Sequence, residues 1–118
     1  MIDWRVENGK DIYSEEGWYF PSFIIQEYLI PLVNVGHKYI DEYNDTKFTK
    51  DDCMRIKGNI EYLLDSKYFD QKKTIKYDSF SKGVQLIDSE EIKDCLLKLY
   101  SAADYALETQ GILKYYGD

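Results

Sequence analysis

The chain has 118 residues, of which 44% are hydrophobic and 31% are charged. This length is typical of one domain, and the composition excludes a disordered chain and allows a core that needs neither disulfide nor metal. Twenty-two acidic and fifteen basic residues give a net charge of −7. Direct binding to nucleic acid is therefore disfavoured, because an acidic surface repels phosphate backbones.

The N-terminal segment has the alternation of a strand. Ile2, Trp4 and Val6 are apolar, and the residues between them are charged. Asn8-Gly9 follows, which is a favoured two-residue hairpin turn. Residues 10–13 can return as a second short strand, so we expect a short hairpin at this end of the chain.

The next element is a helix that we expect to begin at Pro21 or Ser22 and to end near Asn44. Proline suits the first helical position, where its missing N–H would have no partner. The apolar positions recur at intervals of three and four residues: Ile24, Tyr28, Leu32, Val35 and Tyr39. Such broad apolar coverage indicates a central helix. Pro31 predicts a kink or a break in it.

A second helix is predicted from Thr49 to about Ser66. Thr49 is a good N-cap, and Asp52 stands three residues later in a position that resembles a capping box. Residues 67–87 then contain two short stretches of alternating apolar and polar residues. The segment 81–83 (Ser-Lys-Gly) can turn between them, so we expect a second short hairpin.

The third helix begins at Asp88 or Ser89, with Glu90 and Glu91 in its first turn, where the helix dipole favours negative charge. Gly111 is the expected C-cap. Residues 112–116 form an apolar tail that we expect to pack back on the domain. The resulting prediction for residues 1–118 is a single helical domain, mainly α (α+β), with three principal helices around one core and one or two short β-hairpins.

Few residues of the sequence are spaced as in a catalytic, metal or cofactor site. His37 and Asp41 are spaced for one helical face, which could orient an imidazole for acid–base chemistry, but no nucleophile is placed beside them. The adjacent acidic pairs are better explained as first-turn charges or as solvated residues. We therefore predict no catalytic residue, no metal ligand and no cofactor, and a protein that is not an enzyme.

The two cysteines, Cys53 and Cys95, have no metal or redox spacing. Both fall on apolar faces of predicted helices, which favours buried free thiols, although a disulfide in an oxidising compartment stays open. The N-terminus lacks the pattern of a secretory signal, and the apolar stretch around residues 20–35 is interrupted by polar residues. We expect a cytoplasmic protein that does not associate with membranes.

Residues 67–82 carry a basic band with aromatic residues between the lysines. The lysines are Lys67, Lys72, Lys73, Lys76 and Lys82. Such a mixture can bind single-stranded nucleic acid by charge and stacking. The band contains no arginine, and the rest of the chain is acidic, so a solvated loop and hairpin is the favoured interpretation.

A small acidic chain with many tyrosines and no catalytic motif resembles the immunity proteins of bacterial contact-dependent growth inhibition and other polymorphic toxin systems. The resemblance covers the whole chain as a profile of size, charge and composition. It implies a protein that forms a tight complex with a basic toxin C-terminal domain, typically a nuclease. A self-associating structural or regulatory helical domain is the alternative, favoured by the apolar first helix and the apolar tail.

Under the first hypothesis, acidic and aromatic side chains that leave the core form the interface. The expected partner-binding residues are Asp41, Glu42, Tyr43, Asp45, Asp104 and Glu108. Aromatic anchors would supply binding energy, and the acids would steer the basic partner and set its register.

Overall fold

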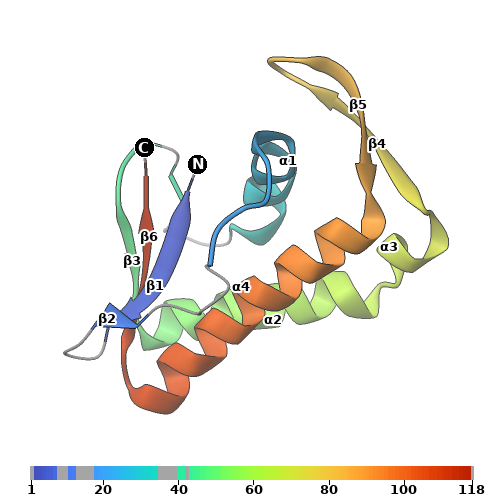
Figure 1. The fold of residues 1–118 in the computed structure, drawn as a ribbon. Coiled ribbons are helices and arrows are strands. Elements are labelled where there is room, and N and C mark those ends of the chain that lie inside the picture. Colours follow the sequence, from blue (N-terminus) through green and yellow to red (C-terminus); the bar gives the residue numbers. More distant parts are fainter. Residues whose placement is uncertain (1, 8–10, 13–17, 35–39, 42, 118) are drawn as a thin grey trace.

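The computed structural model describes residues 2–7, 11–12, 18–34, 40–41 and 43–117 (Figure 1). The described strands are β1 (Asp3–Glu7), β2 (Asp11–Ile12), β3 (Thr46–Phe48), β4 (Thr74–Ser79), β5 (Gly83–Asp88) and β6 (Ile112–Tyr116). The described helices are α1 (Phe23–Val33), α2 (Lys50–Asp65), α3 (Tyr68–Gln71) and α4 (Ser89–Thr109).

Four of the strands form an antiparallel sheet in the order β2-β1-β6-β3. Tyr115 of β6 stands opposite Trp4 of β1 on one side and opposite Thr46 of β3 on the other. Alternate residues of these strands, such as Val6 and Leu113, are fully buried. The residues between them, such as Lys114, lie on the other face and are only partly buried. The sheet therefore covers the core with one face.

The prediction of a mainly α domain with three helices around one core is wrong. The fold is α+β, with two antiparallel sheets beside the helices. The largest difference lies in residues 112–116, which we expected to be a tail. They form β6, a central strand that pairs with β1 and β3 at once. Pairing between the two ends of a chain leaves no local pattern in a sequence, because the turn that would join the strands is absent.

The first helix is also shorter than predicted. It ends at Val33, two residues after Pro31 and eleven before Asn44, and Asn34 caps it with an extended backbone. The Asn34 side chain accepts a hydrogen bond from the Ile40 N–H at 2.8 Å and donates one to the Ile40 carbonyl at 3.4 Å. Asparagine competes for backbone groups in this way, which favours the end of a helix. Residues 35–39 lie outside the described part.

The other two predicted helices are confirmed. Thr49 and Asp52 form a capping box at the start of α2. The Asp88 side chain accepts a hydrogen bond from the Glu90 N–H at 2.8 Å and caps α4. The C-cap of α4 is Gln110, with φ of 56°, rather than Gly111. The two helices pack against each other as an antiparallel pair (Figure 1).

Both predicted hairpins are confirmed as strand pairs. Val6 of β1 pairs with Ile12 of β2, while the predicted turn at residues 8–9 lies outside the described part. β4 and β5 pair along six positions, and Gly83, with φ of 71°, closes the turn between them. Three residues, 80–82, lie between the paired Ser79 and Gly83, and short loops next to a left-handed glycine are common hairpin connections. We call residues 72–87 the arm, because Figure 1 shows this hairpin standing off the body beyond α1.

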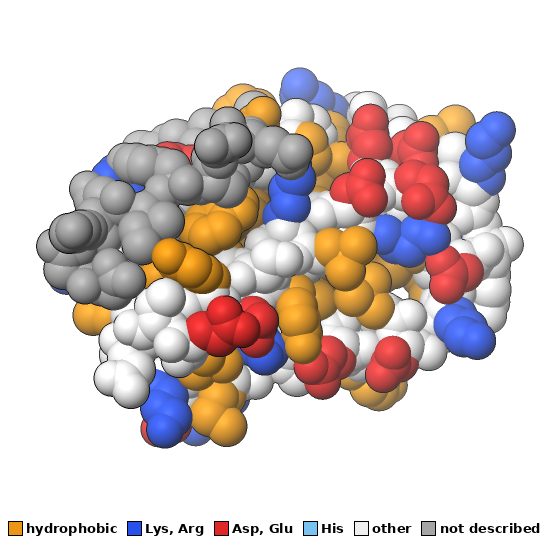
Figure 2. All heavy atoms as spheres, turned by 60° about the horizontal axis from the view of Figure 1, so that its bottom comes forward, with side chains coloured by type: hydrophobic (Ala, Val, Ile, Leu, Met, Phe, Trp, Pro, Cys, Tyr) orange, Lys and Arg blue, Asp and Glu red, His pale blue; other side chains and the backbone are white. Residues whose placement is uncertain are grey.

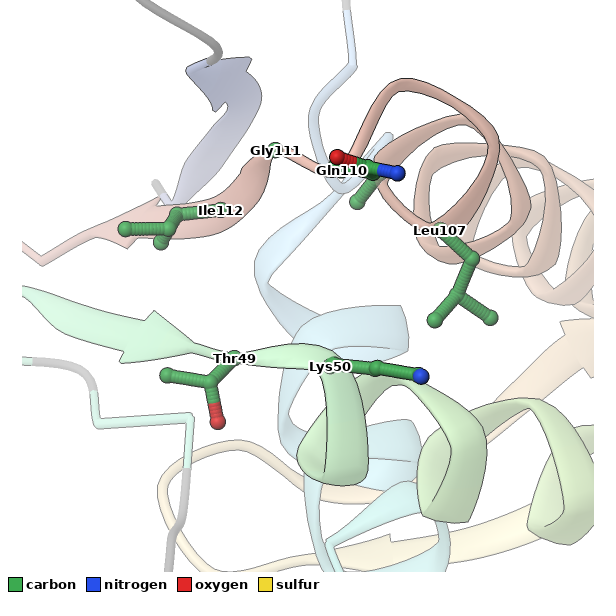
Figure 3. A pocket seen from close by; sticks show the side chains of 7 residues that line it. Thr49, Lys50, Leu107, Gln110, Gly111 and Ile112 are labelled. Atoms are coloured by element: carbon green, nitrogen blue, oxygen red, sulfur yellow. The ribbon is translucent and has the colours of Figure 1, made fainter.

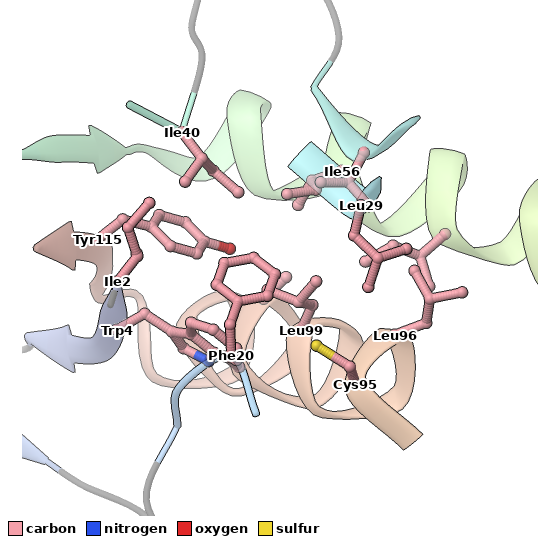
Figure 4. Close-up of a cluster of buried hydrophobic side chains, with 14 of the residues drawn as sticks. Ile2, Trp4, Phe20, Leu29, Ile40, Ile56, Cys95, Leu96, Leu99 and Tyr115 are labelled. Atoms are coloured by element: carbon pink, nitrogen blue, oxygen red, sulfur yellow. The ribbon is translucent and has the colours of Figure 1, made fainter. Parts of the chain in front are cut away.

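The core lies between the four-stranded sheet, α1 and the α2–α4 pair (Figure 4). Aromatic rings from distant parts of the chain meet there edge to face. The Trp4 ring lies 5.2 Å from Phe20, and the Phe48 ring lies 5.2 Å from Tyr115. Leu96 and Leu99 of α4 complete this cluster and are fully buried. The tyrosine-rich composition is thus used partly inside the molecule.

Candidate protein-binding surface

The outward face of α4 carries a line of acidic side chains. Spacings of four and three residues place six positions on this face: Glu90, Asp94, Leu97, Ser101, Asp104 and Glu108. Asp94 and Glu108 are exposed, and Leu97 is 51% exposed among them. The line extends for about 27 Å, since each helical residue rises about 1.5 Å. Four carboxylates are therefore fixed along one rigid element.

Helix α2 contributes a second row to the same surface. The Lys57 ammonium contacts the Asp104 carboxylate at 2.6 Å, and the Tyr100 hydroxyl donates a hydrogen bond to Glu61 at 2.8 Å. Lys57 also lies 4.9 Å from the centre of the Tyr100 ring. These contacts join the two helices in antiparallel register. We call this surface the α2–α4 face; it consists of the acidic line on α4 together with Tyr100 and with Lys57 and Glu61 of α2.

The titration of these groups reflects the contacts between the helices. The hydrogen bond that Lys57 donates to Asp104 raises the pKa of Lys57, so the lysine stays charged. The hydrogen bond to Glu61 raises the pKa of the Tyr100 hydroxyl, which stays protonated as a donor. Figure 2, in which the bottom of Figure 1 comes forward, shows acidic side chains gathered around hydrophobic ones on this side.

One lysine partly neutralises the carboxylates at the start of α4. The Lys93 ammonium lies 2.6 Å from Asp70 of α3 and 2.8 Å from Glu90. The hydrogen bond with Asp70 raises the pKa of Lys93 well above its ordinary value. One lysine therefore serves two carboxylates at this end. The negative charge that faces solvent is accordingly greater at Asp94 and Glu108.

A cavity of about 460 Å³ opens at one end of the α2–α4 face, between the start of α2 and the end of α4 (Figure 3). It is lined by Thr49, Lys50, Ala106, Leu107, Gln110, Gly111 and Ile112. Leu107 and Ile112 supply its apolar walls, and Ile112 is 37% exposed. Its volume is in the range of small ligand-binding or side-chain-binding pockets.

Gly111 allows the chain to pass from α4 into β6 at this cavity. A Cβ atom at this position would lie 2.7 Å from the Glu7 carbonyl oxygen and 3.0 Å from Val6 Cγ1. Glycine alone permits such a close approach between backbones. The end of α4 is thereby held directly against β1.

The structure does not bring the predicted partner-binding residues together. Asp104 and Glu108 lie on α4, just before β6 begins, whereas Asp45 lies beside its far end, because Thr46 pairs with Tyr115. The length of β6 separates the two groups by about 13 Å. Glu42 lies outside the described residues. The prediction therefore divides into two separate surfaces.

The two described acids of the loop before β3 have structural contacts. Asp41 accepts hydrogen bonds from the Tyr43 N–H at 2.8 Å and from the Asn44 side chain at 3.2 Å. The first of these lowers the pKa of Asp41. Asp45 accepts from the Gly117 N–H at 3.2 Å and lies 3.8 Å from Lys114. Tyr43 is also exposed, at 78%.

Sequence reasoning did not assign Glu61, Asp94 or Tyr100 to this surface. Asp94 could have been found, because it continues the four-and-three spacing from Glu90 to Glu108. Glu61 and Tyr100 required the register between α2 and α4, which no single helix pattern contains. They are polar groups that meet only after the helices have packed.

Both cysteines are buried free thiols, as predicted. Burial raises the pKa of Cys95 to about 12. The contacts Lys57–Asp104 and Tyr100–Glu61 place Cys95 beside the last turn of α2, while Cys53 is in its first turn. No disulfide joins the two thiols, which lie on different helices.

The described residues contain no group of three or more potential metal ligands. His37 lies outside the described residues. Four lysines of the basic band, Lys72, Lys73, Lys76 and Lys82, are exposed on the arm, and Lys67 caps α3. Among the helices described, none is both long and apolar enough to cross a membrane.

No family model, no curated protein and no solved structure matches the chain. Its function is therefore argued from its own surface.

Proposed function

We propose that this chain is an immunity-type binding protein that neutralises a basic toxin domain, typically a nuclease, by forming a tight complex in the cytoplasm. The observation that carries the proposal is the α2–α4 face, with four carboxylates in line on the outward side of α4. A nuclease binds a polyanion through lysine and arginine side chains. A rigid row of carboxylates offers the same charge in a fixed geometry.

The surface also offers apolar anchors, which supply most of the energy in protein interfaces. Leu97 on α4 is 51% exposed, and Met54 on α2, one turn before Lys57, is 55% exposed. Charged groups around such anchors speed the encounter and fix the register of the partner. In this proposal Asp104 and Glu108 keep their expected role, and Glu61, Asp94 and Tyr100 join them.

The loop before β3 receives a different role. Asp41 and Asp45 hold the local backbone, so replacing them would disturb the loop as well as any contact with a partner. Tyr43 is exposed and remains a candidate contact residue. Charge reversal on α4 therefore tests the proposal more cleanly than charge reversal in this loop.

The experiment is co-expression with the toxin C-terminal domain encoded by the adjacent gene, followed by calorimetry of the purified pair. The double variant Asp94→Lys, Glu108→Lys is expected to weaken binding by about a hundredfold and to abolish protection of the host cell. Both residues are exposed, so the fold should persist. The matched control is Asp78→Lys, another exposed carboxylate reversal, which lies on the arm.

Equal affinity for the double variant and for the wild-type chain would refute the assignment to the α2–α4 face. A neighbouring toxin domain that is not bound at all would refute the proposed function itself.

The alternative of a self-associating helical domain loses its original basis. It rests on the apolar first helix and the apolar tail, and several apolar side chains of both elements are used in the core. Ile25 and Leu29 of α1 are buried, as are Leu113 and Tyr115 of β6. A different element, the arm, bears on self-association.

A further inference from the structure

The arm is joined firmly to the body at its base. Ser89, the first residue of α4, donates hydrogen bonds from its N–H to the Lys73 carbonyl at 3.0 Å and from its hydroxyl to the Lys72 carbonyl at 2.6 Å. Ile75 and Ile87 pair across the two strands and are buried against the helices. The arm is therefore a fixed extension of the domain.

The tip of the arm is held by one carboxylate of α1. Glu27 accepts hydrogen bonds from the Tyr77 hydroxyl at 3.0 Å, the Ser79 hydroxyl at 2.9 Å and the Phe80 N–H at 2.8 Å. The hydrogen bond from the Phe80 N–H lowers the pKa of Glu27, so the carboxylate is charged at neutral pH. Glu27 thus fixes the backbone at Phe80.

This fixed backbone presents apolar side chains to solvent. Phe80 is 102% exposed at the tip, and Leu86 and Val84 on β5 are 72% and 58% exposed. The strand register places Val84 and Leu86 opposite Asp78 and Lys76 on the outward face. An ordered backbone that holds a phenylalanine in water resembles a preorganised interface anchor, because little conformational entropy remains to be lost on binding.

The charge of the arm indicates the chemistry of its partner. Residues 72–87 contain four lysines and one aspartate, a net charge of +3. Since the whole chain carries −7, the remainder carries −10. A partner for the arm should be acidic and should offer an apolar recess for Phe80. A second copy of this chain meets both conditions.

The recess is the cavity between the start of α2 and the end of α4. Its apolar walls include Leu107 and Ile112, and Lys50 and Gln110 stand at its polar rim. A cavity of about 460 Å³ has room for a phenyl ring. The arm precedes α4 and the cavity follows it, so about 31 Å of helix separates them within one molecule. Phe80 must therefore come from another molecule.

We propose that the arm docks on a second copy of this chain, with Phe80 in the cavity of that copy and the lysines of the arm against its acidic body. Arm and cavity lie at opposite ends of α4. Two copies with antiparallel α4 helices can then make both contacts at once, which closes a symmetric dimer rather than a filament. The proposal does not depend on the toxin proposed above.

Sedimentation velocity of the full chain over a range of concentrations tests this proposal. The wild-type chain is expected to dimerise reversibly, and added salt should weaken the dimer. Phe80→Ala is expected to raise the dimer dissociation constant at least about tenfold. Ile112→Lys, which places a cation in the recess, should do the same from the other side of the contact. Phe23→Ala, at a 55% exposed phenylalanine on α1, is the matched control and should leave the dimer unchanged.

A chain that stays monomeric at high micromolar concentration would overturn the proposal. So would a dimer that withstands both Phe80→Ala and Ile112→Lys while each variant keeps the circular dichroism of the wild-type chain. If Phe80→Ala instead weakens only the complex with a toxin domain, the arm serves a different partner and the second copy is excluded as its occupant.

Discussion

The chain builds two antiparallel β-structures by different means. In the arm, β4 and β5 are joined by a tight turn, and residues only a few positions apart pair with each other. In the four-stranded sheet, β1 pairs with β6, so Asp3 meets Tyr116 across almost the whole sequence. The arm leaves Leu86 72% exposed, whereas the sheet buries Leu113 completely. The arm also buries Ile75 and Ile87 on its inner face, so only its outward face is available for contacts with other molecules.

A matched pair of leucine replacements should separate the two regions most strongly. Leu113→Ala removes a fully buried side chain from β6 and is expected to lower the free energy of unfolding by about 3 kcal/mol. Leu86→Ala removes an exposed side chain from β5 and is expected to change it by less than about 0.5 kcal/mol. Urea denaturation measures both. Equal losses would show that the arm contributes to the core as much as the sheet does.

A pair of glycine replacements should show whether the close approach of the chain to β1, just before β6, is needed for stability. Gly111→Ala brings a Cβ atom to 2.7 Å from the Glu7 carbonyl and is expected to cost about 2 kcal/mol, because backbone atoms must shift. Gly58→Ala, in the middle of α2, meets nothing within 4 Å and is expected to stabilise the protein by about 0.5–1 kcal/mol. Thermal denaturation should show the opposite signs. A stable Gly111→Ala variant would mean that β1 need not approach α4 so closely.

Protonation of Glu27 should affect the arm and leave the sheet intact. The pKa of Glu27 in the folded protein is below its ordinary value of 4.5. The stabilisation of the arm by the ionised Glu27 carboxylate is therefore complete at neutral pH. It is lost as the pH falls below 4.5 and through the pKa of Glu27 in the folded protein. Hydrogen exchange at the Phe80 amide, corrected for the intrinsic rate, should become less protected over this range.

In Glu27→Gln this protection should be weak at every pH, because the ionised acceptor is gone. An unchanged protection of Phe80 in that variant would contradict the role given to Glu27.

The smallest effect is expected at the cysteines. Because Cys53 and Cys95 are buried free thiols, an oxidant should leave the unfolding midpoint unchanged relative to a reduced sample. A thiol reagent should label both residues only as fast as the protein unfolds. Rapid labelling of either residue under native conditions would show that the core opens around it.

The contrast between local and long-range pairing also explains which elements could be predicted from the sequence. The helices α2 and α4 were found because their caps are local: Thr49 with Asp52, and Asp88 with Glu90. The arm was found because its alternation and its turn lie within one short segment. Acids on the surface of α4 were partly found, since Asp104 and Glu108 follow helical spacing.

The four-stranded sheet was missed because no sequence pattern near β6 indicates which strands pair with it. The alternation of buried and exposed residues along β6 is also not visible in its residue types. Tyr115 is buried and Tyr116 is only partly buried, although both are tyrosines. The end of α1 was misplaced because the apolar recurrence continues beyond Asn34, whose side chain turns the chain instead. Glu61 and Tyr100 could not be assigned, since their hydrogen bond depends on the register in which α2 packs against α4.

The position of β6 between β1 and β3 has a consequence for the order of folding. During synthesis both β1 and β3 leave the ribosome before β6 exists, and within the described residues they are not hydrogen-bonded to each other. Formation of the complete sheet must therefore wait for residues 112–116, although α2, the arm and α4 can form earlier. Pairing across such a sequence separation is slow relative to local hairpins and helices. In refolding experiments the arm should accordingly become protected from hydrogen exchange before β1.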